Sequence, residues 1–220
     1  GLFWSVVADG KFQQRTSWQT AMRGELPDIP MMIGDTDNEF FAVPEGETEE
    51  ELRATVQKYL GDDAERFLAL IHADQGMEAA GKNAAVGKIE MAIRALCRCR
   101  EKAGAKSPCY IYTFGPEIPG WDHPGAFHSS DLWFFFETLA KCWRPFTGKH
   151  YDLARQMCNY LAAFIKTGDP NCQDADGSEQ ARWIPWSDAA PSRMTFHETP
   201  EQKACPAGDV MEFLVSREIP

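Results

Sequence analysis

Two loops of this sequence carry side chains that could work together as an acid and a base. The first loop, residues 34–40, holds three carboxylates, at Asp35, Asp37 and Glu39. The second loop, residues 125–132, holds His128. A carboxylate that orients an imidazole lets the imidazole take a proton from a hydroxyl nucleophile, which is the chemistry of acyl transfer. By residue type alone, the two loops are candidates for such a pair.

Each loop comes after a short apolar run that predicts a β-strand. Residues 28–34 form a continuous apolar run between turn residues, which suits a strand buried on both faces, as in a parallel sheet. Residues 108–114 form a second run, and a loop rich in proline and glycine leads from it to His128. Sites in open α/β sheets lie at the carboxyl ends of strands, so this placement favours a site here.

Helical patterns alternate with the predicted strands. The predicted helices cover residues 49–60, 64–71, 86–102 and 152–166. The first begins with a capping-box pattern at Thr48, and the last ends at Gly168. Residues 2–9 are β-rich before an Asp-Gly turn signal, and residues 211–215 predict a final strand or a short helix. This alternation indicates the α/β class.

The composition limits the classes of partner. With 220 residues, 44% hydrophobic and 12% aromatic, the chain can bury a core and forms one large domain or two small ones. Its formal net charge of −11 disfavours nucleic acid and anionic membrane as partners, because phosphate would be repelled. No apolar run approaches the roughly 18–20 residues that a membrane span requires.

The number and spacing of the seven cysteines predict free thiols, with neither disulfide bonds nor a metal site. Their number is odd, and Cys97 and Cys99 lack the two-residue gap of a zinc knuckle or redox pair. Reduced structural thiols, with Cys142 and Cys158 in the core, point to a cytoplasmic protein. His123 and His128 lie five positions apart around Pro124 with no cysteine near, so no metal site is expected.

Several motifs together resemble one enzyme family, the type-B carboxylesterases and cholinesterases. Residues 29–34 (IPMMIG), with Glu39 five positions after the glycine, resemble the acid loop of that family. Residues 125–128 (GAFH), followed by acidic Asp131, resemble its histidine loop. Further matches in family order lie at residues 3–10, 143–148, 156–171 and 182–186.

The resemblance implies an α/β-hydrolase fold, of which residues 1–220 would be the C-terminal portion of a single domain. The family's triad runs serine, acid, histidine along the chain, and Glu39 before His128 obeys that order. Glu39, in preference to Asp35 and Asp37, would orient the imidazole, and His128 would move the proton. The implied substrate is a small-molecule carboxylic ester, and neither a metal nor an organic cofactor is implied.

The nucleophile is the missing part. None of the nine serines lies in a G-x-S-x-G elbow, and the glycine-rich oxyanion loop is absent as well. The chain begins at Gly1 without a methionine or a signal peptide, so it is interpreted as the interior of a longer protein. The expected partner is therefore the N-terminal part of the same protein, and the 220 residues alone are predicted to be inactive. The alternative function is a non-catalytic, cholinesterase-like binding or adhesion protein.

Two further features have open interpretations. Asp131 stands where the family usually has glutamate, and it either orients the histidine loop or favours a helix N-terminus by its charge. The aromatic run 133–136 lines a substrate gorge or, as we favour, packs a helix against the sheet.

Overall fold

A four-stranded sheet forms the centre of the molecule. The computed structural model describes residues 7–40, 46, 48–174 and 177–220. The sheet order is β1-β2-β3-β4. Strands β1 (Met31–Thr36), β2 (Cys109–Phe114) and β3 (Ser192–Phe196) are parallel, and β4 (Pro200–Ala204) returns antiparallel to β3. The predicted α/β class is confirmed.

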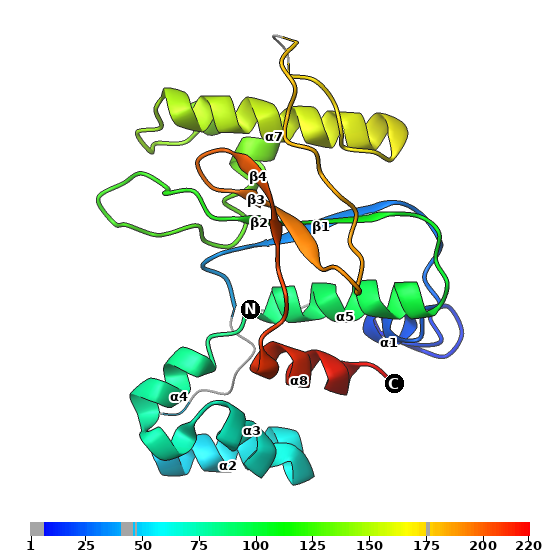
Figure 1. Cartoon of the computed structure of the whole chain (residues 1–220), viewed down its shortest axis with the longest axis vertical. Helices are drawn as coiled ribbons and strands as arrows, with labels where there is room; N and C mark the ends of the chain where they lie inside the picture. The colour runs from blue at the N-terminus through cyan, green and yellow to red at the C-terminus, as the bar shows by residue number, and fades with distance from the viewer. Residues whose placement is uncertain (1–6, 41–45, 47, 175–176) are drawn as a thin grey trace.

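Helices cover both faces of this sheet (Figure 1). On one face lie α7 (Gly148–Thr167) and the short α6 (Leu132–Phe135). On the other lies α5 (Lys88–Lys102), with α1 (Ser17–Met22) and α8 (Asp209–Glu218) packed against it. Beyond α8 lies a lobe of α2 (Glu49–Leu60), α3 (Ala64–Leu70) and α4 (Met77–Asn83). Single 3₁₀ turns occur at Gly61–Asp63, Ala73–Gln75 and Leu139–Lys141.

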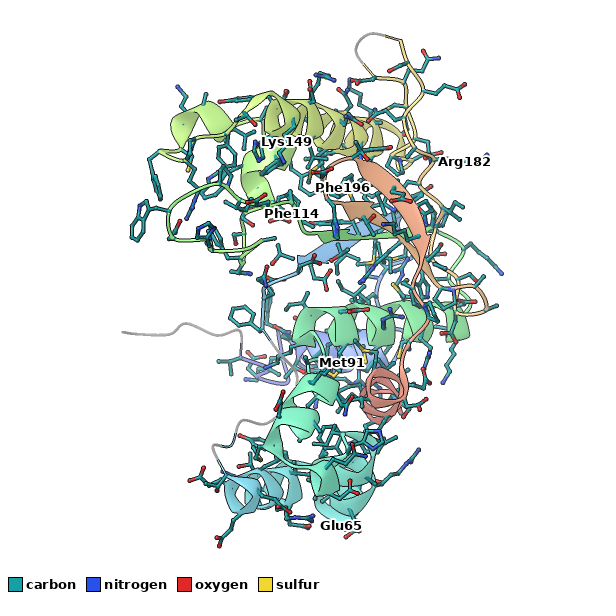
Figure 2. All side chains as sticks on the ribbon, turned by 60° about the vertical axis from the view of Figure 1, so that its left-hand side comes forward. Glu65, Met91, Phe114, Lys149, Arg182 and Phe196 are labelled. Carbon is teal, nitrogen blue, oxygen red and sulfur yellow. The ribbon has the colours of Figure 1, made fainter. Side chains whose placement is uncertain are left out.

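The face of the sheet under α7 is aromatic. Figure 2 shows Phe114 and Phe196 between the sheet and that helix, and both are fully buried. Trp183 is also fully buried, and its indole N–H donates to the Ile111 carbonyl at 3.1 Å. Its ring meets those of Tyr160 and Phe196 nearly edge to face, at centroid distances of 5.6 and 5.5 Å. Such pairs add about 0.5–1.5 kcal/mol each to the hydrophobic term.

The face under α5 is built differently, from thiols, aliphatic side chains and buried charges. The Sγ atoms of Cys97 on α5 and Cys109 on β2 lie 3.2 Å apart. Arg94 is 4% exposed, and its guanidinium donates to Glu90 at 2.6 Å and to the Cys205 carbonyl at 2.9 Å. Because these buried groups have partners, the sheet tolerates charge on this face.

The helical lobe has a small core of its own. Val56, Phe67 and Ile71 are fully buried there, and α8 contributes Phe213 and Leu214 to the same cluster. The lobe therefore packs on α8, with a further contact from Met91 of α5.

Most predicted elements are confirmed, with shifted ends. Helices form at α2, α3, α5 and α7, and residues 211–215 belong to helix α8. Helix α7 begins four residues before the predicted start at 152, because Thr147 caps it together with His150. Strand β1 is half-buried, not buried on both faces as predicted, because it pairs only with β2 and leaves its other edge open within the described part of the chain.

The start of the chain differs from the expectation. The predicted strand at residues 2–9 lies mostly outside the described residues, and residues 7–9 form no strand. The turn at Asp9–Gly10 is confirmed, since the Asp9 carboxylate accepts the backbone N–H groups of residues 11–13. Helices α1 and α4 and the β3–β4 hairpin were not predicted. Among the described residues, no helix is long and apolar enough to cross a membrane.

Candidate active site

The parallel register of β1 and β2 brings the two candidate loops to one edge of the sheet. Thr36 pairs with Phe114 at the ends of the two strands. Beyond them the Asp37 N–H donates to the Phe114 carbonyl at 2.9 Å, and Asn38 forms an isolated bridge with Phe127. The pairing that starts in the strands thus continues into the loops that carry the acid and the histidine.

Glu39 and His128 meet at this edge. The Nδ1 atom of His128 is hydrogen-bonded to Glu39 Oε1, although the residues lie 89 positions apart. The other carboxylate oxygen, Oε2, accepts the Thr36 N–H at 3.0 Å. The Glu39 side chain is 9% exposed and that of His128 61% exposed. A carboxylate bound to Nδ1 of an exposed imidazole makes the second ring nitrogen, Nε2, the one that could accept a proton.

A tight turn presents His128. The Ser130 N–H and Oγ–H both donate to the Phe127 carbonyl, at 3.0 and 2.6 Å. Ser129 adopts a φ of +67°, a left-handed conformation that few residues other than glycine adopt. The ring of Phe40, beside the acid, lies 5.3 Å from the imidazole, centroid to centroid.

Asp131 anchors the histidine loop to the sheet. The Tyr112 hydroxyl of β2 donates to Asp131 Oδ2 at 2.8 Å, and burial raises the pKa of the Asp131 carboxyl above its ordinary value. The carboxylate makes no capping hydrogen bond to α6. Of the two interpretations left open by the sequence, this contact favours the loop-orienting one.

Arg144 braces the proline-rich loop before His128. Its guanidinium donates to both carboxylate oxygens of Asp122, at 2.9 and 2.8 Å, and to the Pro119 carbonyl at 3.0 Å. The same group lies 4.6 Å from the ring centroid of Trp143 and 5.5 Å from that of Phe127. Planar stacking combined with a bidentate ion pair is a role that arginine fills and lysine does not.

The competing carboxylates of the first loop have other partners. Asp37 accepts the Thr113 hydroxyl at 3.0 Å and lies 3.3 Å from His197 Nε2. Asp35 is 9% exposed and lines a cavity of about 150 Å³ next to Glu39. Burial, together with the nearby Glu90 carboxylate, raises the Asp35 pKa to about 7. Within the described residues, His128 therefore pairs with Glu39 and with neither aspartate.

No nucleophile or metal site completes the pair in the described part of the chain. There, no serine, threonine or cysteine side chain hydrogen-bonds to His128. No group of three or more histidine, cysteine, aspartate or glutamate side chains is arranged to hold a metal among those residues either. Of the aromatic run 133–136, Phe134 and Phe135 are buried in the core under α7 as favoured, whereas Trp133 is half-buried and Phe136 is exposed.

Three supporting residues had not been singled out for the site: Asn38, Tyr112 and Arg144. The signal for Tyr112 was its place in the predicted strand ahead of the histidine loop. The signal for Arg144 was its place in a matched motif, residues 143–148. Asn38 stands directly before the acid, but nothing in its local sequence reveals a partner 88 positions away.

Comparison with known proteins places the chain in a family. The model of the carboxylesterase family matches residues 1–213, whereas no curated protein matches. A PNB esterase structure has a TM-score of 0.68 and 20% identity, covering 97% of this chain and 44% of that one. A thermophilic PNB esterase gives 0.63 and 19%, covering 90% and 40%.

A third structure is an esterase from the anaerobe Clostridium hathewayi that can hydrolyse aliphatic aromatic polyesters. Its TM-score is 0.53 at 22% identity, covering 86% of this chain and 37% of that one. At these identities the likeness shows the fold, a mixed α/β-hydrolase architecture, and the chain spans less than half the length of each structure. The match of the family model over residues 1–213 is the stronger finding, and by it the chain belongs to the carboxylesterase family.

Proposed function

We propose that this chain supplies the acid and the base of a serine carboxylesterase, Glu39 and His128. The observation that carries the proposal is their hydrogen bond, made by a buried carboxylate to Nδ1 of an exposed imidazole. A carboxylate on Nδ1 fixes the tautomer in which Nε2 can accept a proton. Family membership supports ester hydrolysis as the reaction class.

The proposed reaction follows the acyl-serine route. His128 Nε2 takes the proton of a serine hydroxyl as the oxygen attacks the ester carbonyl, and Glu39 stabilises the imidazolium that forms. The imidazolium then returns the proton to the departing alkoxide. A water molecule attacks the acyl-serine in the same way, releasing the carboxylic acid.

The serine and the oxyanion donors lie, in this proposal, in an N-terminal part of the same protein. The solved esterases are more than twice as long as the stretch that this chain matches, which leaves room for such a part. The exposure of His128 also supports it, because a base of this kind works in contact with its nucleophile, away from water.

The test compares this chain with a longer chain of the same protein that includes the N-terminal part. Hydrolysis of a p-nitrophenyl ester is measured for both, with His128→Ala and Glu39→Gln in each. We expect only the longer chain to turn over, with His128→Ala lowering kcat by about 10⁴-fold or more. The matched control is His72→Ala, since His72 is an exposed histidine of the helical lobe.

Two outcomes would contradict this proposal. Saturable turnover by the 220 residues alone, lost in both variants, would show that the chain holds its own nucleophile. A longer chain that folds but hydrolyses no ester would favour the non-catalytic binding protein instead.

A further inference from the structure

We infer that Asn38 is the positioning residue that sets the acid and the base at bonding distance. The inference rests on the proposed function, because it concerns how Glu39 and His128 are held for that reaction. Asn38 lies directly before Glu39, and its partner Ala126 lies two residues before His128. The contact between them therefore lies directly beside the hydrogen bond between Glu39 and His128.

Two hydrogen bonds connect Asn38 to Ala126. The Asn38 backbone N–H donates to the Ala126 carbonyl at 3.0 Å. The Asn38 side-chain oxygen, Oδ1, accepts the Ala126 N–H at 2.9 Å. The backbone N–H and C=O of Ala126 are thus both hydrogen-bonded to one residue of the acid loop. The two bonds together fix the distance between the loops and their relative rotation.

The side chain packs tightly on the histidine loop. Gly125 adopts a φ of +63°, and a Cβ atom built on it would lie 2.2 Å from Asn38 Oδ1. Any other residue at position 125 would displace the carboxamide and would also adopt a strained backbone conformation. The glycine of the GAFH motif therefore makes room for the Asn38 side chain.

The contact of Asn38 with Ala126 lies beyond the end of the β1–β2 ladder, and this explains why a side-chain acceptor is needed there. The ladder between β1 and β2 ends at Thr36 and Phe114, and the chain then leaves the sheet before it returns at Ala126. After this excursion Asn38 and Phe127 form an isolated bridge, so among the described residues no adjacent ladder pair holds the returning segment. The Asn38 carboxamide supplies the acceptor that the next rung of a continuous ladder would otherwise provide.

The decisive comparison is between Asn38→Ala and Asn38→Asp. Alanine removes Oδ1 and leaves the Ala126 N–H without its acceptor, whereas aspartate keeps an acceptor oxygen at the same reach. The first readout is the low-field proton resonance of His128 Nδ1–H in the 220-residue chain, with Glu39→Gln as the reference that lacks the carboxylate. The resonance should weaken or shift toward the Glu39→Gln spectrum in Asn38→Ala and persist in Asn38→Asp.

The second readout is catalysis in the longer chain that carries the nucleophile. Asn38→Ala should lower kcat by about 10–100-fold with KM changed less than about threefold, because small displacements of catalytic groups are costly. Asn38→Asp should recover most of that loss. Gly125→Ala should mimic Asn38→Ala, and combining the two should be less severe than the sum, since the clashing Oδ1 is gone.

The results separate this inference from the proposed function. An Asn38→Ala chain with an unchanged low-field resonance and an unchanged kcat would overturn the positioning role. An Asn38→Asp chain that behaves like Asn38→Ala would also overturn it, because the acceptor would then be irrelevant. If the longer chain hydrolyses no ester, the proposed function fails, while the resonance in the 220-residue chain still decides the role of Asn38.

Discussion

The two faces of the sheet are built from alternate residues of the same strands, yet they differ in chemistry. On β2, Tyr110, Tyr112 and Phe114 point toward the aromatic core under α7, whereas Cys109 and Ile111 point toward α5. The aromatic face is largely apolar and is held by edge-to-face contacts. The other face contains paired thiols and arginines, and the buried Asp35 lies at its end.

Because of this difference, the two faces contribute differently to the stability and to the electrostatics of the protein. An aromatic core buries large apolar area and gains stability from it. Buried charges add little stability, but they fix geometry and set the electrostatic environment around them. Asp35, Glu90 and Arg193 lie next to Glu39 at one end of the α5 face, so this face sets the charges near the acid loop while the opposite face stabilises the fold.

The largest expected effect tests the aromatic face. Trp183→Ala removes a fully buried ring that contacts Tyr160 and Phe196 and donates to the Ile111 carbonyl. We expect the free energy of unfolding to fall by about 3–5 kcal/mol, measured by urea denaturation. Trp121→Ala is the matched control, since Trp121 is 84% exposed, and should change it by less than about 0.5 kcal/mol. If both variants lost similar free energy of unfolding, burial of Trp183 in the aromatic face would not account for the loss.

The next effect tests the other face through pH. The Asp35 carboxyl ionises near its ordinary value of 3.8 in the unfolded chain but at about 7 in the folded one. Between these values the folded state binds the extra proton, so stability falls as pH rises from about 4 to 7 and stays low above. A neutral carboxamide at this position would carry no such penalty. Asp35→Asn should therefore be more stable than the natural chain by about 4 kcal/mol at pH 8 and nearly equal at pH 4.

Four neighbouring groups shift the pKa of the Asp35 carboxyl. Glu90 on α5 and Glu39 raise its pKa, whereas Arg193 on β3 and the Thr113 hydroxyl lower it. Asp62→Asn serves as the control, since Asp62 lies in the 3₁₀ turn of the helical lobe. A pH-independent difference between the Asp35→Asn variant and the natural chain would refute the buried, protonated Asp35.

A smaller effect tests the contact between the aromatic face and the site. Tyr112→Phe keeps the ring but removes the hydroxyl that donates to the buried Asp131 carboxylate. We expect a loss of about 1–3 kcal/mol in the free energy of unfolding at pH 7, because an acceptor is left unsatisfied. The double variant Tyr112→Phe/Asp131→Leu should recover part of this loss, and a fully additive result would argue against the pair.

The smallest effect leaves stability unchanged and concerns thiol reactivity. All seven cysteines are free, so titration in denaturant without reductant should return seven thiols per chain. In the folded chain Cys142, Cys158 and Cys172 should react first, because they are half-buried and not in the core as predicted for Cys142 and Cys158. The four buried thiols should react at least about tenfold more slowly, because reagent reaches them only after local opening. Five thiols in denaturant would reveal a disulfide.

Much of the fold could be predicted from the sequence, and the exceptions have physical causes. Strands β1 and β2 are short apolar runs between turn residues, which is a strong local signal. Strand β3 alternates Arg193 and Thr195 with Met194 and Phe196, but over only five residues, and β4 is a largely exposed edge strand. Neither strand has enough apolar periodicity to be recognised without its neighbours.

The residues of the candidate site also divide into those that could be predicted from the sequence and those that could not. The motifs around Glu39 and His128 predicted which residues pair, because family order along the chain carries that information. The contacts of Asn38 with Ala126 and of Arg144 with Asp122 depend on where a proline-rich loop folds back. Local sequence does not encode that return path, so these supporting residues emerged only from the three-dimensional arrangement.

The attachment of the helical lobe through α8 has an evolutionary consequence. Helices α2, α3 and α4 follow one another in the chain between β1 and α5, so the lobe is one stretch set between two parts of the scaffold. Because the lobe has its own core, its length and shape could change while the strands keep their register. A replacement must still cover Phe213 and Leu214 of α8, which would otherwise become an exposed apolar patch on the surface. A change of the lobe is therefore constrained by the helices on which it packs and not by the contact between Glu39 and His128.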